Sequence, residues 1–241
     1  GKGTHRALDR AQEYARKYAF VLQCDVKQFF PSIDHAVLRA EFARLIRDEN
    51  SLWLCDQILQ SGVGVLAEEY EMEFFFFFDL LSANRPRGLP IGNLTSQFWA
   101  NVYLNGFDHF VKRELKCPAY VRYVDDFLLF SNSKQELSQW RNAVIQKVAA
   151  LRLTLHEECA QIFPTRTGIP FLGFRIFPEF RRVKHRKVVH FRRKLRRLLE
   201  GYSTGGFSFE QLNASVQGWI NHVRYADSWG LRRAVLGGVR L

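Results

Sequence analysis

Residues 121–130, VRYVDDFLLF, are the stretch from which the rest of this chain is interpreted. Two short apolar runs, at residues 121–124 and 127–130, flank the adjacent aspartates Asp125 and Asp126. Runs this short and this rich in β-branched and aromatic residues are typical of strands. The stretch therefore predicts a β-hairpin with two carboxylates at its tip.

The two aspartates have two interpretations. Aspartate is a common turn residue, and an isolated Asp-Asp between strands more often has that role alone. Adjacent carboxylates repel each other, and a pair between buried strands is best stabilised by a divalent cation with oxygen ligands. A third carboxylate elsewhere in the chain would favour the metal site.

Asp25 is that third candidate. It ends the apolar run at residues 19–24, which predicts a buried strand that could lie beside the hairpin. Three carboxylates could hold two Mg²⁺ ions about 4 Å apart, which activates a 3′-hydroxyl and stabilises a leaving pyrophosphate. Phe30, five residues after Asp25, either packs in the core or lies under a nucleotide sugar, where a 2′-hydroxyl would clash. Spacing alone leaves both interpretations open.

Three motifs, in this order, resemble the palm of reverse transcriptases. They are Asp25 with an aromatic residue five positions on, GLPIGNLTSQFWANVYLN at residues 88–105, and YVDD at residues 123–126. The resemblance covers nearly the whole chain. It implies an α+β fold: a right-hand polymerase palm, with an antiparallel sheet and packed helices, and partial fingers over residues 1–178, then a basic helical thumb over residues 179–241.

The middle motif departs from the usual pattern of the family. Most members have Gln-Gly and then Ser-Pro, where this chain has Ile91-Gly92 and Ser96-Gln97. This variant resembles the reverse transcriptases of diversity-generating retroelements, which copy an RNA template repeat into error-prone cDNA. In the family a fingers region with basic residues precedes the part seen here, so the chain is expected to be N-terminally incomplete.

The resemblance implies an RNA-directed DNA polymerase that adds dNTPs to a primer 3′-hydroxyl by two-metal phosphoryl transfer. Asp25, Asp125 and Asp126 would be the catalytic residues and hold two Mg²⁺ ions, for which Mn²⁺ could substitute. The implied partners are an RNA template, a DNA or RNA primer and a small basic accessory protein. The residues placed at the nucleotide are Val26, Phe29, Phe30, Ile91, Gly92 and Gln97, and those placed at the primer grip are Phe171, Leu172 and Gly173.

Without the aspartate motifs, residues 84–92 would be an ordinary turn-rich loop. A long amphipathic helix from Thr95 would follow it, with Trp99, Tyr103, Gly106 and Phe110 on its core face. With those motifs present, Gly92 would let a base or a primer backbone approach closely.

Cys159 stands at or near the position where the family often has a lysine that is proposed to protonate the leaving pyrophosphate. A small buried side chain is the favoured interpretation of Cys159. The general acid of this chain would then be water or a basic residue from elsewhere.

Residues 175–199 hold almost the whole charge excess of the chain, with eleven basic side chains against the single acid Glu179. The apolar residues Phe191, Leu195, Leu198 and Leu199 share a helical stripe, so the basic residues must face outward. Charge runs are usually solvated faces, but this one lacks the accompanying acids. The candidates for contact with a nucleic-acid backbone are Arg186, Lys187, Arg192, Arg193, Arg196 and Arg197.

Composition indicates a folded protein with a polyanionic partner and no membrane role. The chain has 241 residues, 47% of them hydrophobic, which supports a real core, and its net charge of +11 favours a polyanionic partner. Its cysteines form no CxxC pair and no zinc spacing, which fits a reducing, cytoplasmic setting, and the resemblance implies a bacterial or phage gene. No apolar run is long enough to span a bilayer, and no signal peptide is present, so no membrane role is expected.

Local patterns predict the other elements. Thr4 is expected to cap a helix to about residue 18, and Asp34 to cap the next one. Further helices are expected around residues 52–60, 137–151 and 228–236, and a capping box at Ser208 and Gln211. The phenylalanines at residues 74–78 predict a strand buried on both faces.

Two alternatives remain open at this level. One is a reverse transcriptase of retron, group II intron or phage-defence type. The other is a non-catalytic RNA-binding fragment that keeps the palm and the basic thumb.

Overall fold

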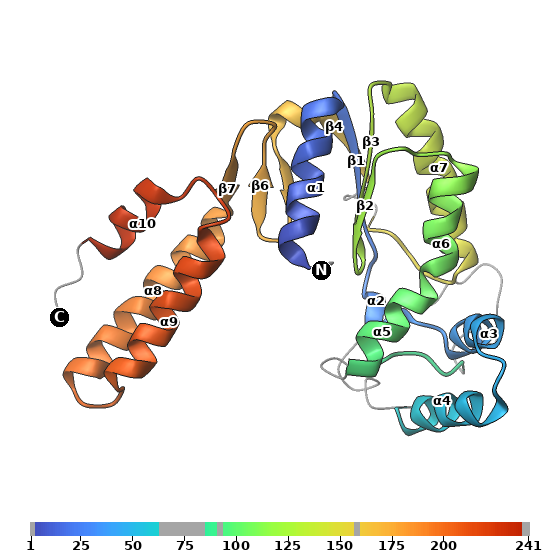
Figure 1. The fold of residues 1–241 in the computed structure, drawn as a ribbon, viewed down its shortest axis with the longest axis horizontal. Coiled ribbons are helices and arrows are strands. Elements are labelled where there is room, and N and C mark those ends of the chain that lie inside the picture. The colour runs from blue at the N-terminus through green and yellow to red at the C-terminus, as the bar shows by residue number, and fades with distance from the viewer. Residues whose placement is uncertain (1–2, 63–84, 91–93, 157–159, 238–241) are drawn as a thin grey trace. The chain divides into compact units, whose positions relative to one another are not determined.

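The computed structural model describes residues 3–62, 85–90, 94–156 and 160–237 (Figure 1). Its internal contacts divide the chain into two compact units. We call residues 21–162 the central unit, and residues 1–20 together with residues 163–241 the terminal unit. The division of the chain into palm and thumb at residue 178 stays a prediction.

The central unit contains most of a four-stranded sheet, whose strand order is β2-β3-β1-β4. Its strands are β1 (Phe20–Asp25), β2 (Tyr120–Tyr123), β3 (Asp126–Ser131) and β4 (Gln161–Pro164). β2 and β3 are antiparallel, with Tyr123 opposite Asp126. The side chains of β3 are almost fully buried from Phe127 to Phe130. Because β1 is the neighbour of β3, the two strands that carry the predicted aspartates lie side by side.

Helices make up most of the rest of the central unit. They are α2 (Phe29–Ser32), α3 (His35–Leu45), α4 (Glu49–Ser61), α5 (Leu94–Tyr103), α6 (Asn105–His109), the π-helix η2 (Phe110–Glu114) and α7 (Lys134–Ala150). Asp34 caps α3 as predicted, since its carboxylate accepts a hydrogen bond from the N–H of Val37 at 3.1 Å. Helix α4 begins earlier than predicted because the Asp48 side chain caps it, accepting from the N–H of Ser51 at 2.7 Å.

The prediction of one long helix after Thr95 is wrong. Helix α5 ends at Tyr103, and the chain continues through α6 into η2. Phe107 is fully buried, whereas Phe110 is only half-buried, so the core face differs from the predicted one. The N–H of Leu115 donates to the carbonyl of Phe110, the five-residue spacing of a π-helix.

The terminal unit combines one helix, a small sheet and three further helices. Its elements are α1 (Thr4–Lys17), the 3₁₀ helix η3 (Thr165–Thr167), β5 (Ile169–Phe171), β6 (Phe174–Ile176), β7 (Arg181–Val183), α8 (His185–Ser203), α9 (Phe209–Val223) and α10 (Trp229–Leu236). The three strands are antiparallel in the order β5-β6-β7. Thr4 is the first residue of α1, and Gly3 precedes it at the cap position, so the predicted cap is wrong by one residue.

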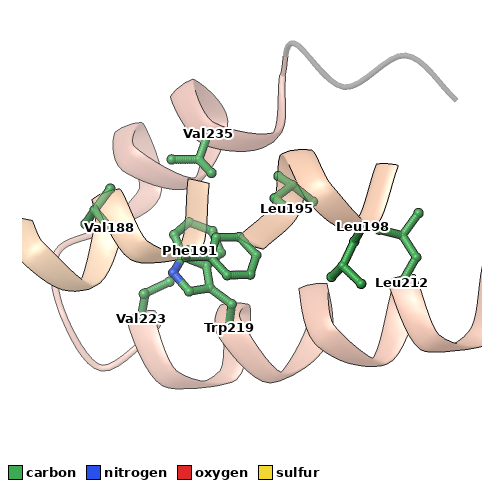
Figure 2. Packing of buried hydrophobic residues seen from close by; sticks show 8 residues of the cluster. All are labelled: Val188, Phe191, Leu195, Leu198, Leu212, Trp219, Val223 and Val235. Atoms are coloured by element: carbon green, nitrogen blue, oxygen red, sulfur yellow. The ribbon is translucent and has the colours of Figure 1, made fainter. Parts of the chain in front are cut away.

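An apolar cluster holds α8, α9 and α10 together (Figure 2). Phe191 of α8 and Trp219 of α9 stack with their ring centroids 4.3 Å apart and nearly parallel. The predicted stripe is confirmed, because Phe191, Leu195 and Leu198 are buried while the basic residues between them are exposed. The predicted capping box of Ser208 and Gln211 is also present at the start of α9.

Some predictions fall outside the described residues: the strand at residues 74–78, and the roles of Ile91, Gly92 and Cys159. Among the helices that the structure describes, none is both long and apolar enough to cross a bilayer.

Candidate active site

Asp25 is the last residue of β1, and the segment at residues 154–156 fixes it there. The carbonyl of Asp25 accepts a hydrogen bond from the N–H of His156 at 3.0 Å, and the N–H of Lys27 donates to the carbonyl of Thr154 at 2.8 Å. Between these two bonds, Val26 forms a bridge with Leu155. These contacts hold the main chain directly after the Asp25 side chain, which is half-buried.

Asp125 lies in the turn of the β2–β3 hairpin. Because Tyr123 pairs with Asp126, the connection consists of two residues, Val124 and Asp125. Val124 has a φ of 57°, a left-handed conformation that a β-branched residue rarely adopts. The predicted tip with both carboxylates is therefore corrected: Asp125 is in the turn, and Asp126 is the first residue of β3.

Asp25 and Asp125 stand at the ends of neighbouring strands and influence each other electrostatically. Burial raises the pKa of Asp125, and the negative charge of Asp25 raises it further, although the main-chain amides of Asp125 and Asp126 partly offset both effects. Burial also raises the pKa of Asp25. The fold thus brings together two half-buried carboxylates from distant parts of the sequence.

His156 is a residue near this pair that the motifs did not single out. Its interaction with Asp25 lowers the pKa of that carboxyl, which opposes the effect of burial. No spacing pattern points to His156, because its place depends on how residues 154–156 meet the end of β1.

The donor chemistry of the pair fits Mg²⁺, which prefers carboxylate oxygens. Two carboxylates that repel each other in a partly buried place would be stabilised by a divalent cation between them. Across the described ranges, no group of three or more His, Cys, Asp and Glu side chains is arranged to hold a metal ion. A site that includes Asp126 as a third ligand stays a prediction.

Phe30 is joined to the loop at residues 85–90 within the central unit. The N–H of Leu89 donates to the carbonyl of Phe30 at 3.0 Å, and that of Gly88 to the carbonyl of Ile33 at 2.9 Å. Val26 and Phe29 are 2% exposed and belong to the core, whereas Phe30 is half-buried. Of these three predicted nucleotide contacts, Phe30 is therefore the most exposed to solvent.

The sequence pattern of the family described as Reverse transcriptase (RNA-dependent DNA polymerase) matches residues 1–176. This chain belongs to the reverse transcriptase family. The prediction of a reverse transcriptase is therefore confirmed at the level of the family. No curated protein shows significant similarity to the chain in sequence.

Two solved telomerase structures resemble the fold of this reverse transcriptase. Telomerase from Candida albicans, in complex with a TWJ fragment of telomeric RNA, has a TM-score of 0.54 and 13% identity, and the match covers 98% of this chain and 49% of that one. Apo telomerase from Candida tropicalis, truncated from its C-terminal domain, has a TM-score of 0.50 and 14% identity, and the match covers 73% and 39%. The chain thus spans about half the length of the first telomerase chain and less than half of the second. At such identities the likeness concerns the fold, and it supports the predicted α+β class.

The predicted primer grip of the reverse transcriptase is the turn between β5 and β6. Leu172 and Gly173 form this two-residue turn with φ values of 48° and 87°. Both values are positive, which is the pattern of the tight hairpin turns that suit twisted strands. The carbonyl of Gly173 accepts a hydrogen bond from the N–H of Lys184 at 3.0 Å, so the turn is attached to the start of α8. Phe171 itself is buried.

The predicted phosphate contacts of the reverse transcriptase lie on α8 and are exposed. They are Arg186, Lys187, Arg192, Arg193, Arg196 and Arg197. Gln97 of α5 is also exposed, while its neighbour Ser96 is 2% exposed.

Proposed function

We propose that this reverse transcriptase extends a primer along an RNA template, with its chemistry at Asp25 and Asp125. The observation that carries this proposal is that β1, which ends at Asp25, lies beside β3, which begins directly after Asp125. The negative charge of Asp25 accordingly raises the pKa of Asp125. Paired carboxylates that disfavour ionisation are typical of sites that bind divalent cations or transfer protons.

Asp25 and Asp125 would hold the metal ions, and Asp126 would share or tune that binding. The chemistry that bound Mg²⁺, or Mn²⁺ in its place, supplies is activation of the primer 3′-hydroxyl and neutralisation of charge on the leaving pyrophosphate. The half-buried ring of Phe30 would exclude a nucleotide with a 2′-hydroxyl. The main role of the protein is then to position its substrates, as in other phosphoryl transfers.

Residues 1–178 would act as the palm with partial fingers, and residues 179–241 as the thumb. The exposed basic residues of α8 support a thumb that binds the phosphate backbone of a template–primer duplex.

Within the family we place the chain with the enzymes of diversity-generating retroelements, which make error-prone cDNA. The support is the variant middle motif, in which Ile91-Gly92 and Ser96-Gln97 replace the usual residues. The exposed position of Gln97 is compatible with contact to a nucleotide or a template base. A structured template RNA and a small basic accessory protein would be its partners.

The experiment is primer extension on an RNA template with Mg²⁺ and dNTPs. Asp125→Asn and Asp25→Asn should each lower the rate at least about a thousandfold, or ~4 kcal/mol, without unfolding the protein. The matched control is Asp56→Asn, which removes a carboxylate of the same unit that pairs with Arg39. This control should extend the primer at close to the wild-type rate.

The outcomes of primer extension distinguish the proposed site from the non-catalytic alternative. Synthesis that persists in Asp125→Asn would refute the proposed site. A wild-type chain that binds RNA but extends no primer, even with its accessory protein and any upstream sequence supplied, would favour the non-catalytic RNA-binding alternative.

A further inference from the structure

The side chain of Arg122, on β2, is 9% exposed although it carries a permanent charge. Burial of a guanidinium is costly unless its donors are satisfied by well-placed partners. Arg122 is next to Tyr123, the first residue of the YVDD motif, and it lies outside all three family motifs. The contacts of Arg122 must therefore compensate for the burial of its charge.

Asp108 of α6 receives two hydrogen bonds from this guanidinium. Nε of Arg122 donates to Oδ1 of Asp108 at 2.8 Å, and Nη2 donates to Oδ2 at 2.6 Å. The hydroxyl of Tyr120 donates to Oδ1 of Asp108 as well, at 2.7 Å. This two-point contact fixes the plane of the guanidinium, which the single ammonium of a lysine could not do.

The third nitrogen of Arg122 reaches the turn that carries Asp125. Nη1 donates to the carbonyl of Val124 at 3.0 Å, and also to Oδ1 of Asn101 at 3.2 Å. Nδ2 of Asn101 in turn donates to the carbonyl of Gln97 at 2.9 Å. One guanidinium thus joins the β2–β3 turn to α6 and to α5.

The turn needs such support. Val124 has a positive φ of 57°, and a β-branched residue in this region is strained. Strained conformations at functional sites persist only where surrounding contacts determine them. The contact between Arg122 and the carbonyl of Val124 is a contact of this kind, since it fixes the peptide that leads into Asp125.

We infer that Arg122 is a positioning residue for the reaction: held by Asp108, it fixes the carbonyl of Val124 and thereby the orientation of Asp125. Through Asn101 it also links this turn to the stretch of α5 that contains Gln97. The expected loss of activity rests on the proposed function, whereas the expected effect on the conformation of the β2–β3 turn does not.

The test compares Arg122→Lys with Arg39→Lys. Both substitutions keep the charge and alter an arginine paired with an aspartate in the central unit, but Arg39 lies on α3 and pairs with Asp56 of α4. We expect Arg122→Lys to lower kcat by about tenfold to a hundredfold, with the KM for dNTP changed less than about threefold. Arg39→Lys should change neither quantity by more than about twofold.

Amide hydrogen exchange gives a readout that does not depend on activity. In Arg122→Lys, the peptide covering residues 120–130 should exchange at least about tenfold faster than in the wild type, while α7 keeps its protection. If Arg122→Lys does not fold, Asp108→Asn is the second variant, because it keeps one oxygen that can accept from the guanidinium and removes the second acceptor and the counter-charge. The same loss of protection over residues 120–130 is expected there.

The outcomes separate the two proposals. A wild type that stays inactive with its accessory protein and any upstream sequence supplied would contradict the proposed polymerase, while the exchange data would still decide the role of Arg122. Wild-type exchange over residues 120–130 in both Arg122→Lys and Asp108→Asn would overturn the inference. So would an equal loss of kcat in Arg39→Lys.

Discussion

The main-chain N–H of Leu89 donates a hydrogen bond to the carbonyl of Phe30, with the two atoms 3.0 Å apart. Leu89 precedes the variant Ile91-Gly92 pair by two residues, and Phe30 follows Asp25 by five. One hydrogen bond therefore connects two motifs that the sequence separates widely. It attaches the segment that carries Phe30, the predicted sugar contact, to the loop at residues 85–90.

We predict that Phe30→Ala raises the incorporation of ribonucleotides relative to deoxyribonucleotides by about tenfold or more. The physical reason is steric, because removal of the ring makes room for a 2′-hydroxyl. The measurement is the ratio of kcat/KM for matched rNTP and dNTP substrates in primer extension.

The control for this prediction is Phe209→Ala, which truncates an aromatic residue of the terminal unit that is 48% exposed. It should leave the ratio unchanged. If Phe30→Ala lowers stability but leaves rNTP use as in the wild type, Phe30 is a core residue only.

The raised pKa values of Asp25 and Asp125 predict how stability depends on pH. A carboxyl whose folded-state pKa is raised stabilises the fold below its unfolded pKa, and this contribution is lost as pH rises through the folded pKa. In the Asp125→Asn variant, the side chain at position 125 is uncharged at every pH. Relative to the wild type, this variant should therefore gain stability as pH rises from about 4 towards neutrality.

The measurement is urea unfolding of both proteins between pH 4 and pH 8 in the presence of a chelator. The quantity to compare is the difference in unfolding free energy between the two proteins at each pH, since other titrating groups affect both proteins alike. A difference that stays constant with pH would show that the Asp125 carboxyl is not perturbed in the fold.

The exposed basic face of α8 predicts a salt-dependent affinity for nucleic acid. Replacing Arg192, Arg193, Arg196 and Arg197 with glutamine should weaken binding to an RNA–DNA duplex. The slope of log K against log salt should fall by about one for each phosphate that is no longer neutralised. Fluorescence anisotropy at several salt concentrations measures both quantities.

The matched control removes four exposed charges from the central unit, at Arg44, Arg47, Lys112 and Arg113. Both variants then have the same net charge. If the two sets of substitutions lower the affinity and the salt slope equally, binding depends on total charge and not on the α8 face.

Features that depend on near neighbours were predicted well. The Asp34 cap, the Ser208–Gln211 capping box and the apolar stripe of α8 are all present. Each is formed within a few residues of chain, so the residue types in one turn suffice to specify it.

Features that depend on distant contacts were predicted less well: the strand that ends at Asp25 does lie beside the hairpin, but the course of the chain after Thr95 was not foreseen. The helix after Thr95 breaks at Leu104 and becomes a π-helix at Phe110, although its apolar spacing is compatible with a continuous helix. Phe107 of α6, the helix that follows the break, is fully buried, and its ring centroid lies 5.0 Å from that of Phe127 on β3. Packing against the sheet therefore outweighs local helix preference at this point.

The sequence by itself determined the family and the carboxylates of the candidate site, because motif order and residue type are written in the chain. Tertiary structure decided which carboxylates interact, since Asp25 and Asp125 repel each other only where β1 lies beside β3. It also decided the role of Arg122, whose partner Asp108 lies on a different element. The physical reason is that hydrogen bonds and charge interactions depend on distance in space, and pairing of the strands brings these groups within range.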